Sequence, residues 1–363
     1  MLVISRNTAF TYRNKPLDTK QIGRELGVRY VLEGSVRRSG NQVRVNAQLI
    51  DAETDAHLWA ERFNGDTSDL FALQDEITSR IAVTLSLELV RAEAARPTEH
   101  PDALDYILRG RAASARPLTR ETITEAIDLY ERALTLDPHS VGVQSVLALA
   151  LSGRVLAGLA KSPVSDIARA EGLAGRALAV LPRSWLAHNA KGHVLRAQRR
   201  FVEAIPEYEA VLASNRNSVL ALHALGQCKM FTGAIEETIP LMEQAIRLSP
   251  RDPNISVFYS EIGLVHLLQS RIDDAILWLE KARNANPEHP SPRARLASAY
   301  GLRGDGDRAS TELAEARKLS RDGRYSSIAA SQAVLGYWGV PKIRTMFEAT
   351  YFTGLRKAGM PEE

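Results

Sequence analysis

The pattern of apolar and polar positions changes character near residues 96 and 97. Before this point, runs with a period of two alternate with runs of helical period. After it only helical periodicity remains, rich in Ala and Leu and interrupted by Pro and Gly. The pattern therefore predicts an α/β domain over residues 1–96, followed by an all-α region over 97–363.

The front region is expected to form a small mixed sheet with helices. Asp18 or Thr19 is placed to cap a first helix and Gly27 to end it. Asp66 or Thr67 precedes a long amphipathic pattern that extends to about residue 95. The expected order is a strand at 2–6, a helix at 17–26, strands at 28–38, 42–51 and 56–63, and the long helix.

The stretch at 31–51 has glycines and arginines together, which raises the question of a phosphate-binding loop. Gly34 and Gly40 are six residues apart and Gln42 follows, so the Walker spacing is absent. Gly40-Asn41 instead predicts a two-residue hairpin turn, because both residues tolerate positive φ. In this register, residues whose numbers sum to 81 face each other, and one face is wholly apolar: Leu32, Gly34, Val36, Val45, Ala47 and Leu49.

The same register places Arg37 opposite Arg44. Directly opposed like charges cost a fraction of about 1 kcal/mol. Two long side chains that splay into water explain the pair; an acidic partner docked at the hairpin tip is the alternative. Arg37 and Arg44 are therefore candidates for a secondary contact with a partner.

The second region repeats a phrase that ends a helix. The phrases end at residues 138, 182, 216, 250, 287 and 321, and the steps between them are 44, 34, 34, 37 and 34 residues. A period of 34 is the length of a tetratricopeptide repeat, a helix–turn–helix unit. The pattern predicts about six such repeats over 97–325, with capping helices and a tail over 326–363.

Internal positions support the repeat. If the last residue of each phrase is position 32, small residues recur at positions 8, 20 and 27, and a large residue recurs at position 24. Packed helices approach closely only where side chains are small. Unit two holds about ten extra residues, which we place between its helices at 159–166, and unit four has Thr238 at position 20.

Stacked repeats form a superhelix whose first helices line a groove. Positions 2, 5, 9 and 12 of each unit are expected to face this groove. In unit five they are Val257, Ser260, Leu264 and Leu267, so the groove becomes apolar toward its C-terminal side. The candidate protein-binding residues in units three and four are Asn189, His193, Arg196, His223, Gln227 and Met230. Simple solvation of these side chains is the alternative.

Composition excludes several classes of protein. The 45% apolar and 25% charged residues are ordinary for a globular protein, and the net charge is only +3, so we expect no direct nucleic-acid binding. Gln144 and Arg154 interrupt the most apolar window, 141–160, so no membrane span is expected. Cys228 is the single cysteine, which fits a cytoplasmic location and rules out an intrachain disulfide and paired-cysteine zinc sites.

No catalytic motif is present in the sequence. No H-E-x-x-H and no G-x-S-x-G pattern occurs, and His188 and His193 are five apart, off the spacing of a shared helical face. Asp51, Glu53 and Asp55 alternate near a strand end, where a solvated turn is favoured over a cation site. We expect a protein that is not an enzyme and has no cofactor.

The front region resembles a known family. GVRYVLEGSVRRSGNQVRVNAQLIDAETDAHLWAERFNGD, DLFALQDEIT and SRNTAFTYRNK are similar to the TolB-amino-terminal-like α/β domain. That domain recurs before tetratricopeptide repeats in proteobacterial signalling proteins, often after a class III adenylate/guanylate cyclase or winged-helix domain. Its members usually have a further strand and helix before the segment LVISRN, which here directly follows Met1. The resemblance implies a partial domain with an open edge.

Two functions follow from these observations. The repeats indicate a non-enzymatic scaffold that binds a protein or peptide partner in the groove, and self-association is a further expectation. The resemblance indicates, as the alternative, a sensory or regulatory tail of an adenylate cyclase-type or transcription-regulator signalling protein.

Overall fold

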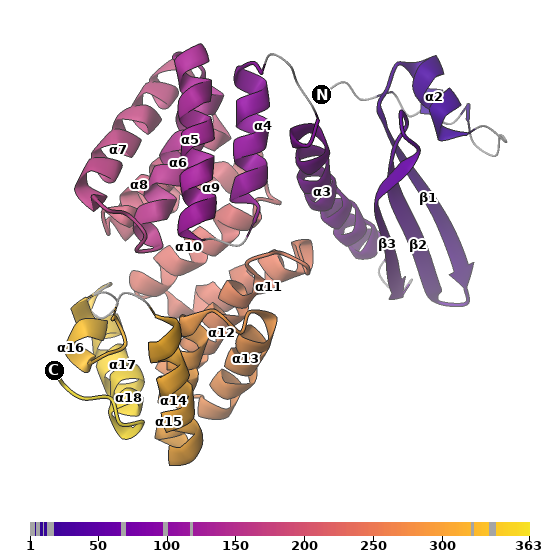
Figure 1. The fold of residues 1–363 in the computed structure, drawn as a ribbon. Helices are drawn as coiled ribbons and strands as arrows, with labels where there is room; N and C mark the ends of the chain where they lie inside the picture. The colour runs from indigo at the N-terminus through magenta and orange to yellow at the C-terminus, as the bar shows by residue number, and fades with distance from the viewer. Residues whose placement is uncertain are drawn as a thin grey trace. The chain divides into compact units, whose positions relative to one another are not determined.

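The structure, a computed structural model, describes most of the chain. The description leaves out residues 1–3, 5–7, 10, 13–17, 67–69, 97–100, 117–118, 321–322 and 334–338. The chain divides into two compact units, Met1–Pro97 and Thr98–Glu363 (Figure 1). Each unit has its own elements and is described separately.

The first unit contains a three-stranded antiparallel sheet. Its elements are α2 (Thr19–Leu26), β1 (Tyr30–Ser39), β2 (Gln42–Asp51), β3 (Ala56–Asp66) and α3 (Leu70–Ala94). The strand order is β1-β2-β3. The strand expected at 2–6 lies almost wholly outside the described residues, and without it the described sheet is antiparallel rather than mixed.

The hairpin register is confirmed. Val36 pairs with Val45 and Arg37 with Arg44, and every pair sums to 81. Gly40 at the turn has a φ of 58°, a conformation that glycine adopts without a steric cost. Helix α2 also begins and ends as expected, because the Asp18 side chain accepts from the Gln21 N–H and Gly27 closes the helix at a φ of 62°.

Only half of the predicted apolar face is covered. Ala47, Phe63 and Ile77 form a small core, against which Leu73 and Ile81 of α3 pack. The apolar residues of β1 stay uncovered, because Leu32 is 48% exposed and Val36 70% exposed. The clean separation of faces in the sequence therefore produces a buried surface on β2 and β3 and an exposed one on β1.

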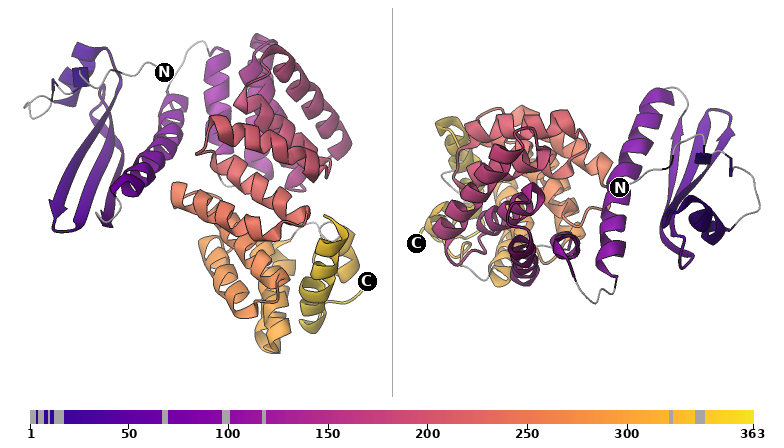
Figure 2. Two further views of the ribbon diagram at one scale, coloured as in Figure 1. Left: turned by 180° about the vertical axis from the view of Figure 1, so that it is seen from behind. Right: turned by 90° about the horizontal axis from the view of Figure 1, so that it is seen from above.

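The second unit is a stack of antiparallel helix pairs (Figures 1 and 2). The pairs are α4 (Ala103–Ser114) with α5 (Arg120–Leu136), α6 (Val141–Leu156) with α7 (Pro163–Val180), α8 (Trp185–Ala197) with α9 (Phe201–Ser214), α10 (Val219–Phe231) with η2 (Ile235–Glu237) and α11 (Thr238–Leu248), α12 (Ile255–Leu268) with α13 (Ile272–Ala285), and α14 (Pro290–Arg303) with α15 (Gly306–Leu319). The predicted solenoid of helix pairs is confirmed. The extra residues of unit two lengthen α6 and α7, so they do not form an insertion at 159–166 alone.

A small residue at position 8 lets the two helices of a repeat approach each other. A Cβ added at Gly192 would lie 2.8 Å from the ring of Tyr208, and one added at Gly263 would lie 2.6 Å from Leu279. Gly110 meets Tyr130 in the same way, at 2.4 Å. The large residue at position 24 thus rests on the bare backbone of position 8, and the helices approach closely at this small residue, as the sequence pattern predicted.

The small residues at positions 20 and 27 are completely buried. Ala126, Ala204 and Ala309 at position 20 have no exposed surface. Thr238, the exception in unit four, is equally buried, and its hydroxyl donates to the carbonyl of Gly226 at 3.0 Å. A polar side chain is tolerated there because its hydrogen bond is satisfied.

Three repeats share a hydrogen bond that the sequence did not reveal. A polar side chain near the start of the first helix bonds the carbonyl of the proline that lies two residues after the end of the preceding helix. The pairs are Gln144 with Pro138 at 2.8 Å, His188 with Pro182 at 2.9 Å and Arg293 with Pro287 at 3.1 Å. This bond fixes the turn between repeats, where the chain has no helical partner for that carbonyl.

The C-terminal segment closes the stack on α14. The helix pair expected at 326–359 is only partly formed in the described residues: α16 spans Ile328–Ser331, while α17 (Pro341–Phe347), the π-helical η4 (Glu348–Phe352) and α18 (Thr353–Lys357) run on as one helix. A Cβ added at Gly354 would lie 2.2 Å from the carbonyl of Ser298, whose hydroxyl donates to the Tyr351 carbonyl at 2.8 Å. The segment therefore crosses α14 backbone to backbone.

We expect Gly354→Ala to destabilise the protein by more than about 2 kcal/mol, because the added methyl group meets backbone that cannot move aside. Gly175→Ala is the matched control, since a Cβ there meets nothing within 4 Å. It should stabilise helix α7 by about 0.5–1 kcal/mol. Urea unfolding of the two variants measures both effects, and equal stabilities would contradict the close crossing.

Candidate functional site

The six groove candidates lie on two successive first helices. Asn189, His193 and Arg196 are on α8, while His223, Gln227 and Met230 are on α10. The Arg196 guanidinium donates to the Gln227 side chain, so the two helices share a face at this point. We call Asn189, His193, Arg196, His223 and Gln227 the polar row.

Burial corrects the expectation of an open or solvated surface. The exposed fractions are 2% for Asn189, 5% for His193, 7% for Arg196 and 1% for Met230, while His223 and Gln227 are half-buried. The period of the repeat places these residues on the right helices, but neighbouring first helices pack so closely that their side chains meet one another. Direct contact of the candidates with a partner stays a prediction.

His193 is turned into the packing between the helices of its own repeat. Its Nδ1 lies 3.1 Å from the carbonyl of Asn189 and 3.0 Å from the hydroxyl of Tyr208. The two rings meet edge to face with centroids 5.6 Å apart. Burial, followed by the nearby charge of Arg196, lowers the pKa of His193 well below its ordinary value. The ring is therefore neutral at neutral pH.

Two groups of the polar row have no hydrogen-bond partner among the described residues. They are Oδ1 of Asn189 and Nε2 of His223, on adjacent first helices. The His223 ring stacks on Phe258 with centroids 5.4 Å apart. An unsatisfied buried polar group costs roughly 1–3 kcal/mol, so a ligand that forms hydrogen bonds with these two groups would offset that cost.

The row continues into two residues that the sequence reasoning missed. Arg295 of α14 donates to Ser260 at 2.8 Å and to Glu261 at 3.2 Å, and Oε2 of Glu261 has no further partner among the described residues. Glu261 and Arg295 are opposite charges one repeat period, 34 residues, apart. That spacing was a signal available in the sequence.

Charges along the row set the protonation of His223. Burial, then the positive charge of Arg196, lowers its pKa to about 4; Glu261 opposes this effect and Arg295 adds to it. A cation in the row therefore disfavours a second positive charge on the ring. At neutral pH, His223 offers one donor and one acceptor.

The apolar part of the predicted groove is occupied by the chain itself. Leu264 and Leu267 belong to the core that contains Phe347, Tyr351 and Phe352 of the C-terminal helix. The N–H of Val340 also donates to the carbonyl of Phe231, at the end of α10, at 2.9 Å. The expected apolar surface for a partner is thus covered, and the polar row is what remains of the candidate site.

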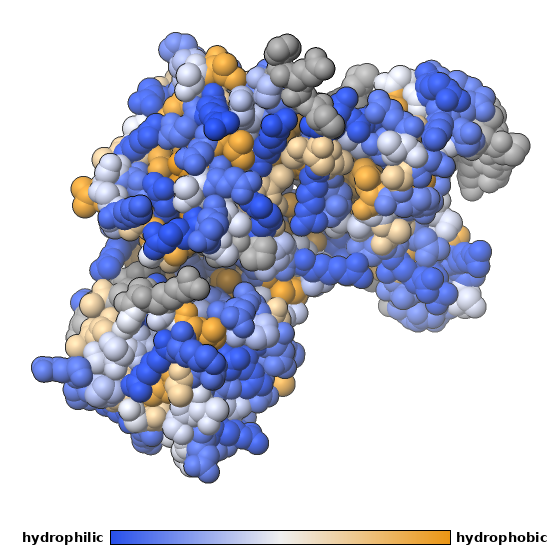
Figure 3. Space-filling view, viewed as in Figure 1, coloured by the Kyte–Doolittle hydropathy of each residue, from blue (hydrophilic) through white to orange (hydrophobic). Residues whose placement is uncertain are grey.

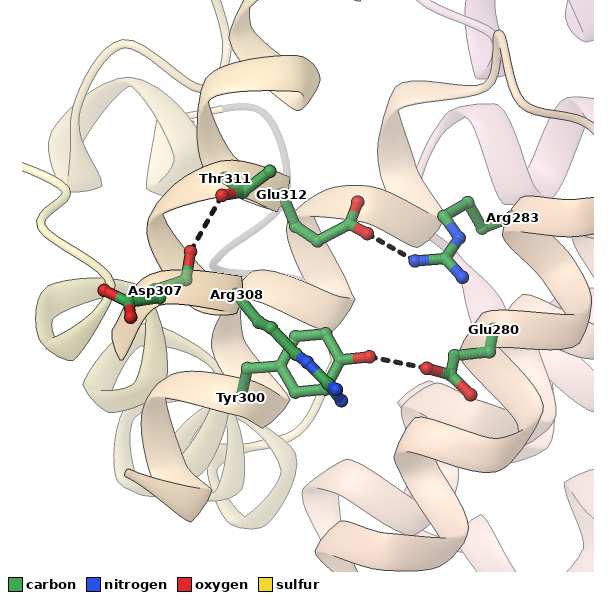
Figure 4. Close-up of a pocket in the computed structure, with 7 residues that line it drawn as sticks. All are labelled: Glu280, Arg283, Tyr300, Asp307, Arg308, Thr311 and Glu312. Carbon is green, nitrogen blue, oxygen red and sulfur yellow. Dashed lines mark hydrogen bonds and ion pairs between the residues drawn. The ribbon is translucent and has the colours of Figure 1, made fainter. Parts of the chain in front are cut away.

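A hollow of about 390 Å³ lies among α13, α14 and α15 (Figure 4). Four of its lining side chains, Glu280, Arg283, Tyr300 and Glu312, are already hydrogen-bonded. Arg283 and Arg293 both bond Glu312, the latter at 3.0 Å, and the Tyr300 hydroxyl donates to Glu280 at 2.6 Å. A ligand would have to replace these bonds, so the hollow is the weaker candidate.

The acidic turn after β2 is a structural ion-pair cluster. Arg29 binds Asp51 at 3.0 Å and lies 3.6 Å from Glu53 and 3.7 Å from Glu93 of α3. Asp51 is 4% exposed, so the expected solvated turn is wrong at this residue. Burial would raise the pKa of Asp51, but the hydrogen bond from Arg29 lowers it below its ordinary value. Within the described residues, no cluster of His, Cys, Asp and Glu is arranged for a metal ion.

Cys228 is a packing residue of the helical core. The side chain is fully buried and burial raises the pKa of its thiol to about 11, so it carries no thiolate at neutral pH.

Among the helices that the structure describes, none combines the length and apolar character needed to cross a membrane.

The comparisons with known proteins agree with the architecture. A tetratricopeptide-repeat family model matches residues 156–219. The structure titled "IFIT1 monomeric mutant (L457E/L464E) with Gppp-AAAA" is similar with a TM-score of 0.55 at 12% identity, covering 80% of this chain and 67% of that one. The APC/C hetero-tetramer Cut9-Hcn1 gives a TM-score of 0.53 at 16% identity, covering 73% and 48%. At these identities the likeness shows the fold alone.

The chain thus contains a small antiparallel sheet that is followed, later in the sequence, by tetratricopeptide repeats. A curated relative is more similar in sequence: over 153 residues the chain is 40% identical to "Putative adenylate cyclase 3" of Rhizobium meliloti (strain 1021). This match covers 41% of the chain and 26% of the relative, so the chain spans about a quarter of that protein's length.

Acid should weaken the fold through His223. Its pKa is about 4 in the folded chain and about 6.5 in an unfolded one, so below pH 6.5 the unfolded state binds the extra proton. Stability is therefore lost as the pH falls from 6.5 toward 4. The free energy of unfolding falls between pH 7 and pH 5, and we expect this fall to be about 1–2 kcal/mol smaller in His223→Gln than in the wild type.

Guanidinium unfolding at both pH values measures this difference. His139→Gln, a change in an exposed turn, should keep the pH dependence of the wild type. If His223→Gln and the wild type respond equally to acid, His223 does not have the lowered pKa described above.

Proposed function

We propose that the protein is a non-enzymatic scaffold that binds a peptide or protein partner along the first helices of its repeats. The observation that carries the proposal is a pair of groups without a hydrogen-bond partner in the described part of the chain, Oδ1 of Asn189 and Nε2 of His223, on adjacent helices α8 and α10. The His223 ring lies within the field of the Arg196 charge, and the Gln227 side chain holds that guanidinium in place.

The chemistry of the row indicates what it would bind. Asn189 Oδ1 accepts hydrogen bonds, and His223 Nε2 accepts or donates according to its tautomer. An extended peptide presents alternating backbone N–H and C=O groups, which match such a row without requiring a particular side chain. The spacing of one repeat between the two groups suits an extended segment that runs along the stack. We keep a cytoplasmic location as part of this proposal.

A selection with displayed random peptides on the immobilised full chain tests the proposal. We expect to select peptides that bind the double variant His223→Ala/Gln227→Ala at least about tenfold more weakly than they bind the wild type. This corresponds to a loss of about 1.4 kcal/mol of binding free energy. Fluorescence anisotropy with the selected peptide measures the loss. Lys318→Ala, on the outer helix α15 with a side chain 74% exposed, is the matched control and should bind as the wild type does.

Urea unfolding of the same variants separates loss of binding from loss of fold. Equal affinity of a folded double variant and the wild type would exclude the polar row as the binding site. Failure of the selection to yield any peptide would count against the scaffold proposal as a whole.

The likeness to an adenylate cyclase favours a second function. We infer that the chain acts as a sensory or regulatory tail for a cyclase-type or transcription-regulator domain, in line with the TolB-like resemblance of its front region. The 40% identity to the Rhizobium meliloti protein supports this interpretation. Sequencing the DNA upstream of Met1 tests this proposal. A cyclase or winged-helix segment encoded there in the same reading frame would support it, and the absence of both would argue against it.

A further inference from the structure

Arg196 is a buried cation without a counter-charge. Its exposed fraction is 7%, and in the described part of the chain it is the only arginine that is buried. Its guanidinium donates to the side chain of Gln227, a neutral group, and makes no ion pair with an acidic side chain among the described residues. Such a charge is unfavourable, because the protein interior does not replace the water that the guanidinium loses.

Two other shielded arginines of the helical unit show the usual solution. Arg154 binds Asp166 at 2.8 Å and Arg295 binds Glu261 at 3.2 Å, with arginine side chains that are 22% and 15% exposed. Exposed arginines need no such partner, because water solvates them, and the face of the helical unit seen in Figure 3 is largely hydrophilic. Arg196 is therefore an exception, since it is both buried and unpaired within the part of the chain that the structure describes.

The side chains around Arg196 do not supply the missing negative charge. Burial and then the Arg196 charge lower the pKa of both His193 and His223, so both rings are neutral at neutral pH. Glu261 also acts on His223, but its Oε1 accepts from Arg295. The polar row together with Glu261 and Arg295 thus carries two positive charges and one negative charge, which leaves a net charge of +1.

We propose that the polar row takes one carboxylate of its bound peptide, from an Asp or Glu side chain, on the guanidinium of Arg196. This inference rests on the proposed function and names a side chain that the peptide must carry. A guanidinium binds a carboxylate through charge-assisted hydrogen bonds. Nε2 of His223, which has no partner among the described residues, donates a further bond in the tautomer that carries its proton there. His223 and Gln227 are only half-buried, so the peptide approaches along α10.

Charge balance favours a carboxylate over a phosphate group. One carboxylate brings the net charge of the row, with Glu261 and Arg295, to zero. A phosphate group carries a charge of about −1.5 to −2 at neutral pH and would leave an excess of negative charge. That excess would act on Oε2 of Glu261, which is buried and has no partner in the described structure.

The position of the row in the stack favours an acidic side chain over the end of the peptide chain. Helices α4 to α7 precede α8, and helices α11 to α15 follow α10. An extended segment that runs along the stack therefore continues past the row, and an acidic residue within that segment meets Arg196.

A charge cycle on the full chain tests the proposal. The peptide is one selected on the immobilised chain, and each Asp or Glu in it is replaced in turn by Asn or Gln. We expect one replacement to weaken binding to the wild type at least about tenfold in fluorescence anisotropy. On Arg196→Met the original and the replaced peptide should bind equally, because the cation that distinguishes them is gone. Arg176→Met, exposed on the second helix α7, is the matched control and should keep the difference.

The outcomes separate this inference from the scaffold proposal. A peptide that needs His223 and Gln227 but tolerates the loss of every acidic side chain would overturn the carboxylate and leave the scaffold proposal intact. Loss of binding on amidation of the peptide C-terminus, with no effect of the acidic side chains, would overturn the assignment to a side chain. A selection that yields no peptide would overturn both proposals.

Urea unfolding shows whether Arg196 is unpaired or structural. Arg295→Met leaves Glu261 buried without its cation, so the unfolding midpoint should fall. Arg196→Met removes a charge that has no acidic partner among the described residues, so its midpoint should fall less, or rise. The acidic peptide should raise the midpoint of the wild type more than that of Arg196→Met. Equal destabilisation by the two substitutions would assign Arg196 a structural role and overturn the proposal.

Discussion

The close approach of the two helices in each repeat is the constraint on which the second unit depends. Gly110, Gly192 and Gly263 present bare backbone to a large side chain on the partner helix. Each pair fixes the distance between helices and, through it, the step to the next repeat. A methyl group at any of these positions would push the helices apart, and the displacement would be passed along the stack.

The same tight step explains why polar side chains lie inside the solenoid. First helices that pack closely bring Arg196 against Gln227 and Arg295 against Glu261. Buried polar groups are tolerated when they are bonded, and most groups of the row are. The few groups that lack a partner among the residues that the structure describes are therefore the feature of the row that packing does not explain, and they are why we place binding there.

The sequence predicted the elements with a strong period and missed the contacts between distant segments. The hairpin register followed from the Gly40-Asn41 turn and from the alternation of apolar residues, because a slip by one residue would have mixed its faces. The repeats followed from spacing. Burial of Asn189 and His193 could not be predicted, because the period tells which helix face a residue occupies but not how near the next helix lies. The role of Arg29 was missed because its partners, Asp51 and Glu93, are far away in the sequence.

The close packing of the C-terminal helix against α14 limits how the stack of repeats can change in length. Gly354 and Ser298 meet through backbone, so the last helix pair must keep a surface that suits this one segment. Duplication of the final repeat would separate the segment from α12, whose apolar residues it covers. Repeats can therefore be gained or lost more readily in the interior of the stack than at this end, and related arrays of different length are expected to share their last repeat and its cap.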